Sequence, residues 1–278
     1  MAGGAPAADS LNNLYLLTGN GSFDADSGGS NYGDSTVKLS TASGLSATGF
    51  FTPDNQLNLN TVDKDHGSGG AAILIDQPSG PVHHLLIGGG KDQILYLVNR
   101  DSLGGFDPAA NHVVQSLNLG QSIFATSSFW NDSLFIAGSG GQLKQFTFNP
   151  VTGLFGITPA HSSPGTFGFP GATPSVSSTP AFLNGIIWGL DNHQFCTQQA
   201  PNCGPTVLYA YDATNVSTEL WNSSQAAGNR DQAGNAVKFT VPTVANGKVY
   251  VGTRGNNTGG AANTTTVPGE LDVYGLLP

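Results

Sequence analysis

Two short acidic segments of the chain have the residue types that bind a hard cation. DADSG at 24–28 and DKDHG at 63–67 both follow the pattern Asp-x-Asp-x-Gly, and Asn20 lies upstream of both. Carboxylate and amide oxygens are the ligands that Ca²⁺ takes in proteins. Asp and Asn side chains in loops also accept hydrogen bonds from nearby backbone N–H groups. The pattern therefore leaves two interpretations open: a calcium site, or polar residues that cap loops.

Cys196 and Cys203 are the only cysteines, and they enclose the loop CTQQAPNC. Their spacing fits neither a CxxC redox pair nor a zinc site. We therefore predict a disulfide that closes this loop, worth roughly 2–3 kcal/mol on the loop-entropy estimate. A structural disulfide indicates an oxidising compartment, so we expect an extracellular or periplasmic protein.

The composition excludes several classes of protein. Only 10% of the 278 residues are charged, and 39 Gly and 16 Pro predict many turns and very little helix. The formal charge of −9 would repel phosphate backbones, so we expect no nucleic-acid partner. No apolar run reaches the roughly 18 residues of a membrane span. No signal peptide precedes Met1, and we interpret MAGGAPAADS as an expression start on a trimmed segment.

Five segments of the chain share one pattern: a short apolar strand, a Gly-rich turn and a second strand. The first strands are predicted at 14–21, 85–91, 134–141, 186–192 and 249–255. The second strands are predicted at 35–40, 94–100, 143–149, 207–213 and 271–277. Successive copies begin roughly 50 to 70 residues apart, a period typical of propeller blades with long loops.

The repeats predict an all-β protein, a β-propeller of four-stranded antiparallel blades. All-β folds of this length commonly form one domain, so we expect a single propeller domain over 1–278. About five blades are expected, at 5–60, 71–120, 126–175, 179–224 and 238–278. The stretch 158–178, rich in Gly, Pro, Ser and Phe, is expected to be a loop.

The last repeat ends on LDVYGLL at 271–277, and no fourth strand follows it. Propellers usually close because the opposite end of the chain supplies the missing strand, which leaves no open edge. MAGG, before Ala5, is too short and too flexible for that role. A five-bladed ring that closes imperfectly is one interpretation. We favour the other, an arc of a larger ring, joined to a second copy or another protein through the edges of the first and last blades.

The segment GKDQILYLVNRDSLGG at 90–105 resembles a characteristic strand and turn of the quinoprotein-like propellers. That eight-bladed family includes the pyrroloquinoline quinone (PQQ) alcohol dehydrogenases. The resemblance covers all five repeats in outline and implies that they correspond to the C-terminal blades of these enzymes.

The resemblance also implies roles for four residues. Asn20, in TGNGS, falls where the family has a calcium-ligating Asn. Asp65 falls at the position of the catalytic base beside the calcium, and Asp63 where some members have a further metal-ligating Asp. Lys91 falls where a basic residue contacts the reactive carbonyls of the quinone. An ionised Asp accepts an alcohol proton, and a cation over the carbonyls stabilises the reduced quinone. Without the resemblance, Lys91 reads as a salt bridge between blades or a residue of the axial channel.

The chain departs from the enzymes in what it lacks. The family's calcium-binding Glu, its ring of adjacent cysteines, the Trp beneath the quinone and most quinone hydrogen bonds come from blades N-terminal to this arc. Only three Trp are present, and ELWNS at 219–223 is the nearest match to the family's tryptophan-docking repeat. The sequence therefore holds at most half of a catalytic site.

Two functions follow from these observations. The first is a secreted propeller that acts as a binding or assembly scaffold, with a protein partner or a second copy at its open blade edges. The second is the C-terminal part of a PQQ- and calcium-dependent alcohol or sugar dehydrogenase. We favour the scaffold because half of the site is missing, and the enzyme question stays open. No cofactor is certain; calcium and PQQ are the two candidates.

Overall fold

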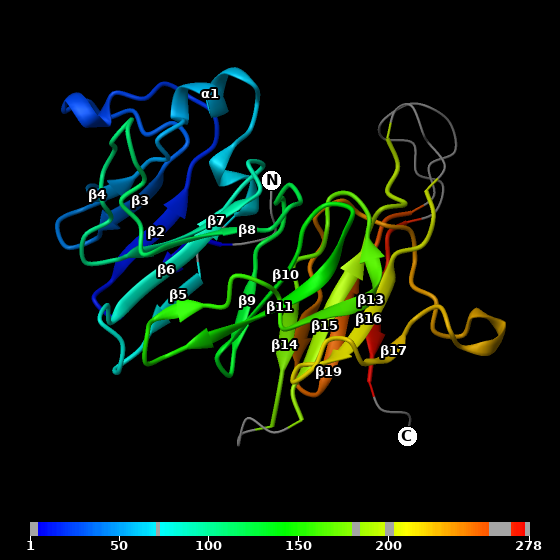
Figure 1. Ribbon diagram of the computed structural model, residues 1–278. Coiled ribbons are helices and arrows are strands. Elements are labelled where there is room, and N and C mark those ends of the chain that lie inside the picture. Colours follow the sequence, from blue (N-terminus) through cyan, green and yellow to red (C-terminus); the bar gives the residue numbers. More distant parts are fainter. Residues whose placement is uncertain (1–4, 71–72, 180–183, 198–202, 256–267, 276–278) are drawn as a thin grey trace. The chain divides into compact units, whose positions relative to one another are not determined.

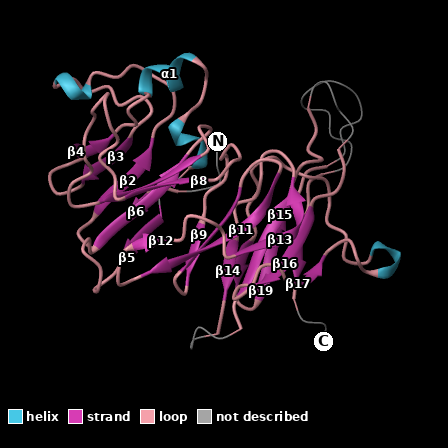
Figure 2. Cartoon of the chain, in the orientation of Figure 1, coloured by secondary structure: helices cyan, strands magenta, loops and turns pink. Residues whose placement is uncertain are grey.

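The computed structural model of the protein describes five stretches of the chain: residues 5–70, 73–179, 184–197, 203–255 and 268–275. Strands make up 41% and helices 6% of the structure (Figures 1 and 2). An all-β chain with very little helix is therefore confirmed. The chain divides into two compact units, 1–133 with 146–158 and 134–145 with 159–278. None of the described helices is long and apolar enough to span a membrane.

The described strands form five antiparallel sheets. The first unit contains β1 (Ala7–Ala8), β2 (Asn13–Leu17), β3 (Thr36–Ser40) and β4 (Ser46–Phe51), then β5 (Ile73–Asp76), β6 (His84–Gly89), β7 (Ile94–Asn99) and β8 (Gln115–Asn118). The third sheet, through which the division between the units passes, contains β9 (Ser128–Trp130), β10 (Ser133–Ala137), β11 (Gly141–Asn149), β12 (Leu154–Phe155) and β13 (His161–Phe167). The second unit contains β14 (Ser175–Ser177), β15 (Ile186–Asp191), β16 (Val207–Asp212) and β17 (Glu219–Asn222), then β18 (Thr243–Ala245), β19 (Lys248–Gly252) and β20 (Leu271–Tyr274).

The repeated strand pairs lie where the sequence predicts them. The five first strands are β2, β6, β10, β15 and β19, and the five second strands are β3, β7, β11, β16 and β20. In the first, second and fourth sheets the strands follow each other in chain order, as in a propeller blade. β6 and β10 are buried along almost their whole length. Continuous apolar runs of this kind are typical of strands covered on both faces.

One expected loop is wrong. The stretch 158–178 contains β13 and β14, and β13 pairs with β11. Gln142 lies opposite Thr166 and Lys144 opposite Ser162, with a shift of register between these pairs. Pro164 lies at the irregularity, where a residue without an N–H costs no regular ladder bond. The Pro- and Gly-rich composition thus marks an irregular strand, not a loop.

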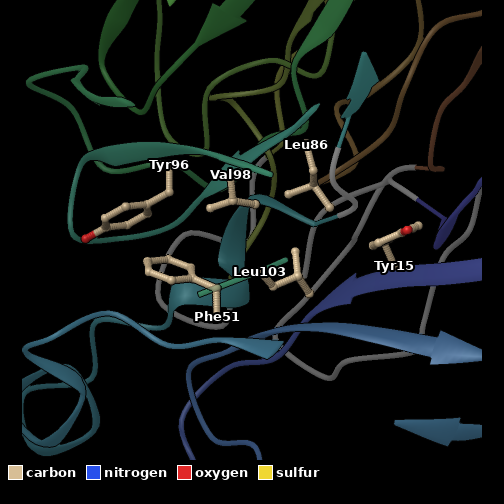
Figure 3. Packing of buried hydrophobic residues seen from close by; sticks show 6 residues of the cluster. All are labelled: Tyr15, Phe51, Leu86, Tyr96, Val98 and Leu103. Atoms are coloured by element: carbon tan, nitrogen blue, oxygen red, sulfur yellow. The ribbon is translucent and has the colours of Figure 1, made fainter. Parts of the chain in front are cut away.

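A buried hydrophobic cluster joins the first two sheets. It consists of Tyr15, Phe51, Leu86, Tyr96, Val98 and Leu103 (Figure 3), none more than 4% exposed. The guanidinium of Arg100, itself only 3% exposed, lies 5.8 Å from the centroid of the Tyr15 ring. Each large apolar side chain buried here contributes about 1.5–3 kcal/mol. The cluster therefore fixes β2 against β6, and the loops that follow these two strands are held with them.

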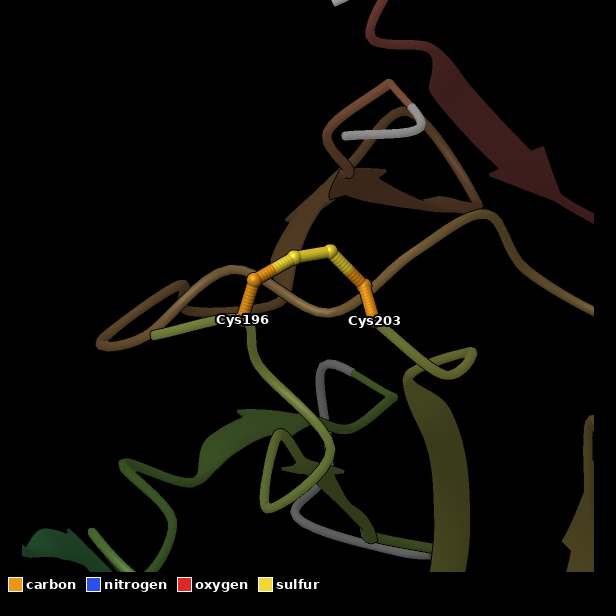
Figure 4. The surroundings of a disulfide bond; sticks show 2 residues. All are labelled: Cys196 and Cys203. Carbon is orange, nitrogen blue, oxygen red and sulfur yellow. A yellow bond between two sulfur atoms is a disulfide. The ribbon is translucent and has the colours of Figure 1, made fainter. Parts of the chain in front are cut away.

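Two features tie down the loops of the second unit. Cys196 and Cys203 form a disulfide between β15 and β16 (Figure 4), with Cα atoms 4.6 Å apart, so the predicted pairing is confirmed. The loop residues 198–202 lie outside the described part of the chain. The ammonium of Lys238 lies 4.4–5.3 Å from the centroids of three aromatic rings, those of Phe169, Phe195 and Phe239. Cation–π contacts of this kind hold three separate segments around one charge.

Candidate functional site

The four residues that the sequence singles out meet in the first unit. Asn20 follows β2, and Lys91 follows β6. Asp63 and Asp65 lie between α1 (Gln56–Thr61) and the 3-10 turn His66–Gly69, on the connection from the first sheet to the second. Loops at the ends of two packed strands and one inter-sheet connection therefore converge on this site.

Lys91 is at the centre of the contacts. Its Nζ lies 2.5 Å from Asp65 Oδ2 and 2.9 Å from Asp63 Oδ1, and it also donates to the Asp63 carbonyl oxygen at 3.0 Å. The backbone N–H of Lys91 donates to the Asp65 carbonyl oxygen at 3.0 Å. Both the main chain and the side chain of Lys91 thus hold the 63–65 segment against the second sheet.

Asn20 attaches the first sheet to the same segment. Its backbone N–H donates to Asp65 Oδ1, and its side-chain Nδ2 donates to Asp63 Oδ1, each at 2.9 Å. The two oxygens of Asp65 therefore accept from different sheets, Oδ1 from the first and Oδ2 from the second. We name Asn20, Asp63, Asp65 and Lys91 the ion-pair joint.

Burial and charge act in opposite directions on the two main partners. The side chains of Lys91 and Asp65 are 15% and 11% exposed, whereas that of Asp63 is 80% exposed. Burial would raise the pKa of Asp65, but the Asn20 N–H and the Lys91 ammonium outweigh it and hold the pKa below its ordinary value. Burial would lower the pKa of Lys91, but the hydrogen bonds to Asp65 and Asp63 raise it. The pair is therefore ionised over a wide range of pH.

Two glycines allow the segments that carry Asn20 and Lys91 to approach Asp65 closely. A Cβ atom on Gly90 would lie 2.0 Å from the carbonyl oxygen of Asp65, and one on Gly19 would lie 2.7 Å from its Oδ1. No side chain fits at these separations, so the Gly residues beside Asn20 and Lys91 are required by packing and not only by turn geometry.

A buried polar pair lies next to the joint, and the sequence analysis did not identify it. The Oδ1 of Asp34 accepts from the backbone N–H of His66 at 3.0 Å, and His66 Nε2 lies 2.9 Å from Thr36 Oγ1. Asp34 and His66 are both fully buried. Burial raises the pKa of Asp34 to about 6 and lowers the pKa of His66 to about 4. Asp34 therefore takes up a proton at a higher pH than an ordinary carboxyl does.

The arrangement does not fit the calcium ion that the resemblance implies. The Lys91 ammonium already lies between the two carboxylates, and a divalent cation there would be repelled by it. Asn20 turns its donor Nδ2, not its oxygen, toward Asp63. Across the described ranges, no group of three or more His, Cys, Asp or Glu side chains is gathered for a metal. The contacts agree with the salt-bridge interpretation of Lys91, because its ammonium is fully engaged by Asp oxygens.

The last sheet presents a different kind of site. β20 pairs with β19 and with no other described strand, so this sheet has three strands where its neighbour has four. Leu271 and Val273, in β20, are 65% and 48% exposed. The outermost strand of the first sheet, β4, is also exposed along its first half, although Phe51 at its end bridges to Gly105.

Comparisons with known proteins give the fold but no family. No protein-family model matches the chain, and no curated protein matches it. Among solved structures, the chain is similar to the C-terminal domain of PilY1 from Pseudomonas aeruginosa (15% identity, TM-score 0.50, covering 87% of this chain and 52% of that one). It is also similar to BamB from Moraxella catarrhalis (14% identity, TM-score 0.42, 89% and 57%).

The PilY1 domain is a β-propeller, and the likeness to it agrees with the repeated sheets. The chain is a β-propeller protein with several four-stranded antiparallel sheets. It spans only about half the length of these two structures, 57% of the BamB chain and 52% of the PilY1 chain. At 15% identity the likeness extends to the fold alone. Membership of the quinoprotein-like family, and one domain over the whole chain, stay predictions.

Proposed function

We propose that this chain is a secreted β-propeller that binds or assembles with other proteins, without a complete catalytic site of its own. The observation that carries the proposal is the open edge of β20. Natural sheets normally protect an edge strand with Lys, Pro or a bulge, or cover it with other chain. β20, with the sequence LDVY, contains no Lys, Pro or bulge. Among the described residues, the segment 231–234 bonds the side chains of Asp272 and Tyr274, whereas Leu271 and Val273 are exposed. An edge of this kind is favourable for joining another polypeptide.

The disulfide supports the location of this activity. Cytosolic thiols are kept reduced, so the pairing of the chain's only two cysteines supports an oxidising compartment. We therefore place the scaffold outside the cell or in a periplasm.

A photo-activated crosslinking side chain at position 271 tests the function. We expect it to crosslink one defined protein in the secreted or periplasmic fraction of the native host. The same side chain at position 151, which is 72% exposed but belongs to the first unit, is the matched control. Equal products from both positions, or none from 271, would contradict a role for the edge.

The dehydrogenase function has one observation in its favour, the convergence of Asn20, Asp65 and Lys91. Calorimetric titration of the protein with PQQ in the presence of calcium tests it. Micromolar binding that is lost in Asp65→Ala would favour the enzyme. If no heat of binding is measured, the scaffold function is favoured. We expect this result because the Lys91 ammonium is already bonded to Asp oxygens.

A further inference from the structure

Two residues of β20 turn their backbone N–H and C=O groups away from the partner strand β19. In an antiparallel pair, one residue turns both its N–H and C=O to the partner strand and the next turns both away. Thr253 N–H donates to the Glu270 carbonyl at 2.9 Å, so Glu270 faces β19. The alternation then turns the N–H and C=O groups of Leu271 and Val273 to the open side. These residues have no hydrogen-bond partner in the described part of the chain.

A groove of about 590 Å³ adjoins this edge, between the last two sheets of the second unit. The rings of Trp221, in β17, and Tyr274, in β20, lie 5.6 Å apart at 62° and form part of its wall. Trp188, Ile186, Val244 and Val249 contribute further apolar surface. The indole N–H of Trp188 donates to Ser177 Oγ at 2.8 Å, so that polar atom is already satisfied.

The charges of the groove favour an acidic occupant. Lys248 lines the groove, is exposed, and has no ionic partner among the described side chains. Arg230, also in the lining, is paired with Asp231 through Nε and Nη2 at 2.6 and 2.8 Å. In a chain with a formal charge of −9, Lys248 is a local positive charge beside an apolar surface. A carboxylate on the incoming segment would meet it.

We propose that the edge of β20 and this groove together bind an extended segment of a partner protein. The segment adds as a fourth strand, with its backbone bonded to Leu271 and Val273. An apolar side chain enters the groove against Trp221 and Tyr274, and a carboxylate faces Lys248. This mode of β-strand addition takes affinity from the backbone and selectivity from alternate side chains. The proposal rests on the scaffold function above and names the chemistry of its partner.

The chain itself supplies a probe. β17 is the fourth strand of the neighbouring sheet, and Glu219 and Trp221 on it are separated by one residue. In β17 a shift of register places these two residues opposite the consecutive residues Tyr211 and Ala210. A capped synthetic peptide of residues 216–224, VSTELWNSS, that extends as a regular strand carries the carboxylate and the aromatic ring on one face. A scrambled peptide of the same composition is the control. Binding is measured by calorimetry and by amide hydrogen exchange on the full chain.

We expect the peptide to slow exchange of the Leu271 and Val273 amides about tenfold or more, because they become bonded. Val273→Pro removes an outward N–H, which an edge strand tolerates, and should weaken binding about tenfold. Val273→Thr keeps the N–H and should bind as the parent does. Lys248→Gln should weaken binding several-fold. Circular dichroism and thermal unfolding of each variant verify that it folds.

Three results would overturn the proposal. Equal binding to Val273→Pro would mean that the groove acts without strand addition. Equal binding of the scrambled peptide would mean that the contact is unselective. Self-association of the parent in sedimentation, abolished by Val273→Pro, would make a second copy the occupant. If the peptide fails while the crosslinker at 271 still captures its partner, strand addition is wrong and the scaffold function stands.

Discussion

At the scale of single residues, the ion-pair joint connects the loops of the first two sheets. Exposed ion pairs contribute about 0–1 kcal/mol, since water and salt screen them. The pair of Lys91 and Asp65 differs because both side chains are no more than 15% exposed and each makes further hydrogen bonds. Removal of one partner from such a pair leaves a charge that water reaches poorly.

Replacement of Lys91 should therefore cost stability. Lys91→Met keeps the aliphatic stem and removes the charge, which leaves Asp65 with backbone N–H donors and no cation. We expect the free energy of unfolding in urea at neutral pH to fall by about 2–3 kcal/mol. Lys248→Met, at an exposed position, should change it by less than about 0.5 kcal/mol. Similar losses in the two variants would contradict the assigned burial of the joint.

The buried pair of Asp34 and His66 leads to a prediction about pH. Asp34, with a pKa of about 6, keeps a proton that the unfolded chain loses, so its contribution falls as pH rises from about 4 to about 6. His66, with a pKa of about 4, stays unprotonated in the folded chain at pH values where the unfolded chain takes up a proton, below about 6.5. Its contribution to the free energy of unfolding therefore rises as pH rises over the same range. The two slopes oppose each other and largely cancel.

Single substitutions should reveal each slope. In Asp34→Asn, which keeps an oxygen for the His66 N–H, the free energy of unfolding should rise by roughly 2–3 kcal/mol between about pH 4 and 6.5. In His66→Gln it should fall by a similar amount between about pH 4 and 6. Urea unfolding at closely spaced pH values measures both. Parallel profiles for the two variants would show that the assignments are wrong.

Sequence reasoning found the members of the joint but not their arrangement. Asn20, Asp63, Asp65 and Lys91 were identified because their residue types match a family pattern, and they do meet. A salt bridge was one interpretation of Lys91, but nothing in the pattern indicates that its ammonium lies between these two carboxylates. Asp34 and His66 carry no local signal at all, because their burial depends on how two sheets pack.

At the scale of elements, strand prediction succeeded where apolar runs alternate with Gly-rich turns. Asn246 and Gly247, with φ of 51° and 72°, form the tight turn between β18 and β19 that such a dipeptide favours. β13 was missed because Pro164 and its neighbouring glycine are typical of loops. Pairing with β11 overrides that local preference, and no window of sequence contains both strands.

Gly90 provides a test of how closely these elements approach. An added methyl group would meet the backbone of Asp65, which cannot move without breaking its bond to the Lys91 N–H. Gly90→Ala should lower the free energy of unfolding by about 2–3 kcal/mol. Gly165→Ala, where nothing lies within 4 Å of the added carbon, should be within about 1 kcal/mol of the parent. Thermal unfolding of both variants makes the comparison.

At the scale of the whole molecule, the five described sheets differ in their number of strands. Four have four or more strands, and the last has three in the described part of the chain. The β-propeller architecture could be predicted from the repeats because each repeat carries the same local pattern. A partner strand for β20 could not be predicted in this way, since the local pattern of a repeat contains no information about what pairs with its third strand.

A covalent fourth strand should stabilise the molecule. Residues 216–224 fused behind Pro278 through a short Gly–Ser turn would be present at an effective concentration near millimolar. We expect a rise in Tm of a few degrees, since about 1 kcal/mol moves the Tm of a chain of this size by about 2–4 °C. The same fusion with Pro in place of Leu220 and Asn222 should give no rise. An equal rise in both fusions would exclude strand addition as its cause.

The basic residues have one more consequence, for survival among digestive enzymes. Enzymes of the trypsin type cut after Lys or Arg, and the chain has nine such residues in 278. Lys91 is held in the ion-pair joint, Arg100 is 3% exposed, and Lys238 is held by three aromatic rings. Cleavage at these sites requires local unfolding first. Because the chain has few Lys and Arg residues, and several of them are buried or held by contacts, such enzymes have few accessible cleavage sites.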